Sequence, residues 1–204
     1  MKIIDLAMDF NFSAMPDSRT AEKRSENANA LYNYCAKHVD ELLAIGNNDG
    51  FHTGMAFVNI VTSMKEPNRN DRHSADNQKF KFSLYCAVFC LWKGTQMGTM
   101  QSCSAANTLI HTIDYYKEQY FVPIFLNLTG YTLEEIFEHD PEDLKKKVDA
   151  IYKHIKYYLI QITRAQDAFK DANIEACNKG KKYLDAMCEE IESAFQGYQL
   201  LGII

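Results

Sequence analysis

Apolar residues recur at helical spacing along most of the chain. From Arg19 to Ile45 they step by three and four positions, which places them on one face of an amphipathic helix. The segment Gly46–Gly50 is rich in glycine and asparagine and predicts the end of that helix. Thr53–Met64 predicts a second helix, although its β-branched residues also suit a strand. Phe80–Trp92 is apolar nearly all round, and its length favours a buried central helix.

Two stretches of the N-terminal half lack this periodicity. Residues 1–17 are interpreted as an irregular or short extended lead-in. Residues 65–78 form the most polar stretch of the chain and hold almost no apolar group that could drive burial. The pattern predicts a long polar loop there, and loops of this length in compact domains are often functional or disordered.

The next elements are marked by their start and stop signals. Ser104–Tyr120 predicts a helix, with Pro123 just beyond it. Thr132 and Glu135 stand at capping-box spacing, where each side chain can satisfy the other residue's backbone N–H, so they predict a helix start. Asp140–Pro141 predicts another start, with the aspartate as cap and the proline at the first helical position.

The clearest periodic signal lies in the C-terminal third. Apolar residues from Leu144 to Ala176 alternate steps of four and three, as in a seam between packed helices. One unbroken rod over residues 141–198 would favour coiled-coil oligomerisation. The favoured interpretation is a helical hairpin broken near 171–173 or 178–180, because such a rod is too long for a compact chain of this size.

Together these elements predict an all-α fold, a bundle of about six helices of which the two C-terminal ones are long. The length of 204 residues is that of one ordinary domain, so residues 1–204 are expected to share a single core.

Composition narrows the class of protein. With 47% hydrophobic residues and a net charge of −5, the chain is too apolar and too weakly charged to be disordered. Its six cysteines lie in apolar surroundings, which is typical of buried free thiols in a reducing cytoplasm. Asp5 and Asp9 interrupt the region where a secretory signal would be apolar, and the longest apolar run, Leu84–Trp92, is too short to span a bilayer. We therefore expect a soluble, cytoplasmic protein without membrane contact.

The polar loop is the best candidate for a binding site. Over residues 65–81 the basic side chains outnumber the acidic ones and give a local charge of +2 in an acidic protein. The candidate partner-binding residues are Lys65, Arg69, Arg72, His73, Lys79 and Lys81. Their charge would suit an acidic protein partner or the phosphates of a single-stranded nucleic acid. Neither half of the chain has the clear basic excess of a nucleic-acid-binding domain, so nucleic acid is the weaker alternative.

Two further sets of residues carry possible chemistry. Cys35, His38 and Glu41 follow one row of a predicted helix and supply thiol, imidazole and carboxylate groups that can bind a metal. His111 and Asp114 lie one turn apart, so the carboxylate could orient the imidazole. No nucleophile elbow or phosphate-binding loop occurs, and no cofactor is predicted.

The sequence thus favours a non-enzymatic helical protein that binds another protein through a helix face and the charged loop, and that could also pair with itself. The alternative from another class is a metal- or small-molecule-binding helical enzyme or sensor.

Overall fold

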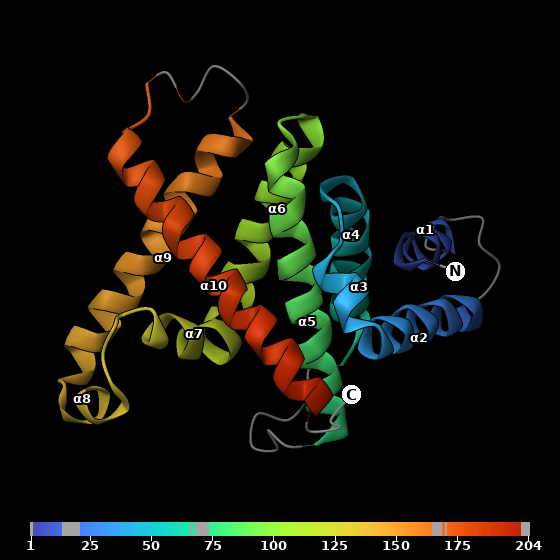
Figure 1. Cartoon of the computed structure of the whole chain (residues 1–204), viewed down its shortest axis with the longest axis horizontal. Coiled ribbons are helices and arrows are strands. Elements are labelled where there is room, and N and C mark those ends of the chain that lie inside the picture. The colour runs from blue at the N-terminus through green and yellow to red at the C-terminus, as the bar shows by residue number, and fades with distance from the viewer. Residues whose placement is uncertain are drawn as a thin grey trace. The chain divides into compact units, whose positions relative to one another are not determined.

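The computed structural model describes residues 2–13, 21–65, 67, 74–164, 169 and 171–200, the side chain of Leu200 excepted. Over these residues the chain is helical and contains no strand, which confirms the all-α prediction. Figure 1 shows the helices along the chain, with the two long C-terminal helices as predicted. The α-helices are α1 (Ile3–Ser13), α2 (Ala21–Lys37), α3 (Val39–Leu43), α4 (Asn47–Ser63), α5 (Ala75–Gly94), α6 (Met100–Tyr116), α7 (Val122–Asn127), α8 (Leu133–Glu138), α9 (Pro141–Thr163) and α10 (Ile174–Leu200).

Contacts divide the chain into two compact units. The first comprises the residues up to Met97 and those from Glu192 onward, and the second comprises Gly98–Ile191. That the two units fold together as one domain stays a prediction.

The first helix of the first unit occupies most of the predicted lead-in. Ile3, Leu6, Ala7 and Phe10 are buried and follow the spacing of one helix face. This face explains why the segment packs as α1 against α2 and α4, where the sequence predicted an irregular or extended stretch over residues 1–17.

The single helix predicted over residues 19–45 is divided. At His38 the backbone leaves the helical region, with φ −125° and ψ 53°, and this residue separates α2 from α3. The break between helices that was predicted at Gly46–Gly50 is also shorter than expected, because α4 already begins at Asn47. α4 is helical through Ser63, which confirms the helix predicted over Thr53–Met64 to within one residue and excludes the strand alternative.

Two glycines let α4 approach α5 closely. A Cβ atom at Gly50 would lie 2.9 Å from the carbonyl oxygen of Cys90, and one at Gly54 would lie 2.8 Å from the backbone nitrogen of Leu91. Gly50 is therefore a packing residue inside a helix, which is why it does not end one.

The predicted central helix is confirmed as α5. Ser74 caps it by accepting a hydrogen bond from the backbone N–H of Asn77 at 3.2 Å. Every residue from Phe82 to Leu91 is buried. Because α5 begins at Ala75, residues 75–78 of the predicted loop are helical.

The second unit begins with a helix that changes its hydrogen-bond pattern. α6 is followed by a π-helical turn over Lys117–Phe121, and the chain continues as α7 with Pro123 in its first turn. The predicted helix over Ser104–Tyr120 therefore starts earlier and widens in its last turn. Such π-turns frequently lie at functional sites.

The C-terminal third is broken, as the favoured interpretation predicted. α9 ends at Thr163 and α10 begins at Ile174, with the side chain of Asn173 accepting a hydrogen bond from the backbone N–H of Ala176 at 3.0 Å. The second predicted breakpoint, 178–180, is wrong. Gly180 lies inside α10, where a Cβ atom would collide with the carbonyl oxygen of His154 on α9.

Candidate interaction surface

The predicted loop cluster is divided by the start of α5. Lys65 is exposed just after α4, whereas Lys79 and Lys81 lie on α5 and are half-buried. Arg69, Arg72 and His73 lie outside the described residues. The partner-binding role of the six residues stays a prediction.

The two candidate lysines of α5, Lys79 and Lys81, contact aromatic rings of their own unit. The Nζ atom of Lys79 donates to Oδ1 of Asn29 at 2.8 Å and lies 4.9 Å from the ring centre of Tyr32. The Nζ atom of Lys81 lies 5.4 Å from the ring centre of Tyr85. These cation–π contacts fix the two ammonium groups against the first unit, so they contribute to its packing.

The three candidate metal ligands do not converge. Cys35 is buried, and burial raises the pKa of its thiol, which disfavours the thiolate that binds metals. His38 is exposed and stacks on Tyr34, with their ring centres 4.3 Å apart. The carboxylate of Glu41 accepts hydrogen bonds from the backbone N–H of Ile3 and the hydroxyl of Tyr34. Within the described part of the chain, no cluster of three or more His, Cys, Asp or Glu residues could hold a metal ion.

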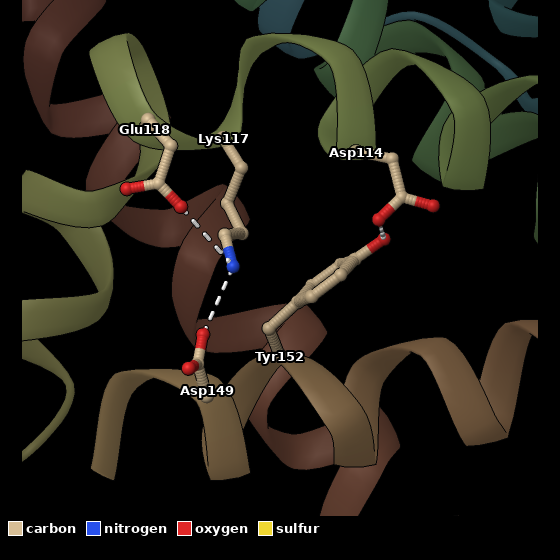
Figure 2. A network of polar contacts seen from close by, with 5 residues as sticks. All are labelled: Asp114, Lys117, Glu118, Asp149 and Tyr152. Atoms are coloured by element: carbon tan, nitrogen blue, oxygen red, sulfur yellow. Dashed lines mark hydrogen bonds and ion pairs between the residues drawn. The ribbon is translucent and has the colours of Figure 1, made fainter. Parts of the chain in front are cut away.

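His111 and Asp114 are the other predicted pair, and Asp114 belongs to a larger polar network. Asp114 accepts hydrogen bonds from the hydroxyl of Tyr152 and from Nζ of Lys156, each at 2.6 Å. Figure 2 shows Tyr152 reaching from α9 to this carboxylate. Asp114 is thereby occupied by two donors from α9, while His111 is exposed.

The π-turn supplies the second half of this network. Lys117 donates to Asp149 of α9 at 2.9 Å and forms an ion pair with Glu118 at 3.3 Å (Figure 2). Its Nζ atom also lies 5.6 Å from the ring centre of Tyr152. The wider turn thus places a lysine between carboxylates of two elements, and the network links the end of α6 to α9.

The pKa shifts in the network follow its ion pairs. Partial burial on its own raises the pKa of Asp114, but the hydrogen bonds from Lys156 and Tyr152 outweigh it and leave the pKa lowered. The hydrogen bond from Lys117 lowers the pKa of Asp149. Burial and the hydrogen bond to Asp114 raise the pKa of Tyr152. Each carboxylate shift favours the ionised form, as expected of a structural clamp.

A different kind of feature lies between α7 and α9, where the short helix α8 is held by caps. Thr132 and Glu135 form the predicted capping box: the Thr132 hydroxyl accepts from the Glu135 N–H at 3.2 Å, and the Glu135 carboxylate accepts from the Thr132 N–H at 2.7 Å. At the other end, the ring of His139 lies 4.2 Å from that of Tyr131. Lys147 of α9 covers the Tyr131 ring, with Nζ 4.1 Å from its centre.

Two of the three apolar side chains of α8 are exposed, and the third, Ile136, is half-buried. None of its residues is buried, and Leu133 and Phe137 are 72% and 83% exposed. The two residues are four apart, so they lie on the same side of the helix, one turn from each other. Each is followed by an exposed glutamate, Glu134 and Glu138. We call Leu133, Phe137, Glu134 and Glu138 the α8 face.

The sequence contained a signal for this surface that the prediction missed. The capping box at Thr132 and the next helix start at Asp140–Pro141 are so close that the helix between them has fewer than two turns. A helix that short, with only three apolar residues, Leu133, Ile136 and Phe137, has little apolar surface with which to pack against the rest of the protein. The prediction used the capping signals only to count helices.

Comparisons of the chain with protein-family models, curated proteins and solved structures find no match. Over the described residues, no helix has both the length and the apolar character required to cross a membrane.

Proposed function

We propose that this protein acts by binding another protein through the α8 face. The observation that carries the proposal is the pair Leu133 and Phe137, two large apolar side chains one turn apart and largely exposed on a helix that its caps hold in place. Aromatic residues on a preorganised element are the usual anchors of protein interfaces, because little conformational entropy is lost on binding. The sequence predicts protein binding through a helix face and the charged loop, and we propose α8 as that helix face.

The remaining candidate residues support this choice by their existing contacts. Asp114 accepts hydrogen bonds from Tyr152 and Lys156, and Lys117 is paired with Asp149. Lys79 and Lys81 lie over aromatic rings of the first unit. The proposed role is therefore non-enzymatic. The six free cysteines, five of them buried, agree with the expected reducing cytoplasm.

The proposal is tested by capture from extracts of the source cells with two matched double variants. Leu133→Ser/Phe137→Ser removes the anchors, and Met100→Ser/Ile174→Ser removes two residues of the second unit that are 81% and 71% exposed. Quantitative mass spectrometry should find a protein that wild type and the Met100/Ile174 variant retain and the α8 variant loses by roughly tenfold or more. Equal recovery of every captured protein by both variants would contradict the proposal.

A further inference from the structure

We infer that the partner segment that docks on the α8 face is a positively charged amphipathic segment of another protein, with an apolar stripe flanked by lysine or arginine. This inference rests on the proposed function and specifies its partner. The apolar stripe would cover Leu133 and Phe137, and the cations would pair with Glu134 and Glu138.

The charged side chains of α8 itself are all acidic, and Lys147 of α9 lies over the neighbouring Tyr131 ring. Residues 131–144 contain six carboxylates and no lysine or arginine. Three of the six have structural roles: Glu135 belongs to the capping box, Asp140 caps α9 by accepting from the Glu142 N–H at 2.8 Å, and Asp143 pairs with Lys146 at 3.1 Å. The other three, Glu134, Glu138 and Glu142, are exposed, and no ion pair involves them among the residues that the structure describes.

The geometry joins this charge to the apolar pair. Glu134 and Glu138 directly follow Leu133 and Phe137, so both glutamates lie on one flank of the apolar ridge. A partner that buries the ridge must therefore bring groups of opposite charge to that flank or leave carboxylates facing an apolar or acidic surface. The like charge of Glu134 and Glu138 disfavours nucleic acid and anionic membranes at this face.

The size of the face sets the expected strength. Two anchors on a six-residue helix fall well below the roughly 1,000 Å² of a stable interface, so we expect an affinity on the order of micromolar and fast exchange. Surface ion pairs are screened by salt, so the affinity should fall as ionic strength rises.

The test uses three fluorescent peptides of about 18 residues, roughly five helical turns. One is an amphipathic Lys/Leu helix, the second has the same leucine stripe with Glu in place of Lys, and the third is a scrambled Lys/Leu sequence. Titration with the full-length protein, followed by fluorescence anisotropy, should show the amphipathic Lys/Leu peptide binding roughly tenfold or more tightly than either of the others.

Variants of the protein assign the binding to the α8 face. Phe137→Ser should weaken the Lys/Leu peptide by roughly tenfold, and Met100→Ser should leave its affinity unchanged. Glu134→Lys/Glu138→Lys should reverse the preference, so that the Glu/Leu peptide binds more tightly. Binding of the Lys/Leu peptide that is indifferent to Phe137, or equal binding of the Glu/Leu peptide to wild type, would overturn the inference.

The two proposals fail separately. If no peptide binds while a captured protein still depends on Leu133 and Phe137, the charged partner is wrong and the interaction surface stands. If capture is the same with both double variants, the proposed function itself is wrong.

Discussion

The helices α5 and α8 show two different ways of holding a helix in one chain. α5 has ten consecutive buried residues, Phe82–Leu91, whereas α8 has none. Most helices in proteins depend on burial of an apolar face, because short helices are marginal in water. α8 depends instead on its capping box and on the Tyr131–His139 stack. A helix held by its ends can leave apolar side chains available to a partner. The side chains of α5 therefore contribute to the stability of the fold, whereas those of α8 are available for the proposed binding.

The largest difference in stability between α5 and α8 is expected when the same substitution, phenylalanine to alanine, is made in both helices. Phe82 is fully buried and contacts the rings of Tyr32 and Phe195 at 5.5 and 5.3 Å, whereas Phe137 is 83% exposed. Phe82→Ala should lower the free energy of unfolding by about 3–5 kcal/mol, and Phe137→Ala should change it by less than about 0.5 kcal/mol. Trp92, the one tryptophan of the chain, lies on α5 and reports the unfolding of the first unit by fluorescence in urea.

Unfolding of the second unit is followed in the same titration by far-ultraviolet circular dichroism. A loss of more than about 2 kcal/mol in Phe137→Ala would mean that α8 is buried against something in solution. The distinction between the two helices would then be lost.

A smaller effect is expected where α4 contacts the backbone of α5. Gly54→Ala places a methyl group 2.8 Å from the nitrogen of Leu91, and the helices must separate to admit it. We expect a cost of about 1–3 kcal/mol in the Trp92-monitored transition. Gly197→Ala in α10 is the control, because nothing lies within 4 Å of its added carbon. It should raise stability by up to about 1 kcal/mol, since alanine favours helix over glycine. Equal effects of the two substitutions would rule out the close contact of α4 with α5.

Removing the N-cap side chain of α5 or of α8 should cost about 1 kcal/mol of helix stability, and the two losses can be compared. Thr132→Ala removes one half of the capping box and should open α8 locally, lowering the protection of its amides from hydrogen exchange roughly fivefold. Ser74→Ala removes the equivalent group of α5, but the buried centre of α5 should exchange only through global unfolding. If Thr132→Ala leaves the α8 amides unchanged, the caps do not hold the helix.

Much of the fold was predictable because it follows from local pattern. The apolar run of α5, the capping box at Thr132 and the start at Asp140 each combine a periodicity with a terminal signal. Long-range contacts were not predictable from such signals. Gly50 resembles a helix terminator in sequence and is a packing residue because α5 lies against it.

The candidate site residues divide in the same way, into those that a local sequence signal identifies and those whose role depends on long-range contacts. The sequence pairs Asp114 with His111, but the hydrogen-bond partners of Asp114 are Tyr152 and Lys156. Both lie on α9, which is distant in sequence. The clamp around the π-turn has no local sequence signature, since Lys117 pairs with Asp149 on α9, which is far away in sequence. The exposure of Leu133 and Phe137 depended on how little other structure covers α8, which periodicity does not report.

The smallest effect concerns pH. Hydrogen bonds from the backbone and side chain of Thr132 hold the pKa of Glu135 below its ordinary value of 4.5. A lowered pKa in the folded state means that the ionised group stabilises α8 fully above pH 4.5, and that this support is lost as the pH falls through the lowered value. Carbonyl chemical shifts of α8 in NMR spectra should move toward coil values in that acidic window. Glu135→Gln should remove this pH dependence, and an identical titration in that variant would contradict the role of the carboxylate.

Hydrogen–deuterium exchange of the full-length protein, with and without the Lys/Leu peptide, tests the central claim most directly. The account predicts measurable exchange at Leu133–Glu138 in the free protein and slower exchange there when the peptide is bound, with α5 unchanged. Protection that appears elsewhere and leaves α8 unchanged would show that the α8 face is not the binding surface.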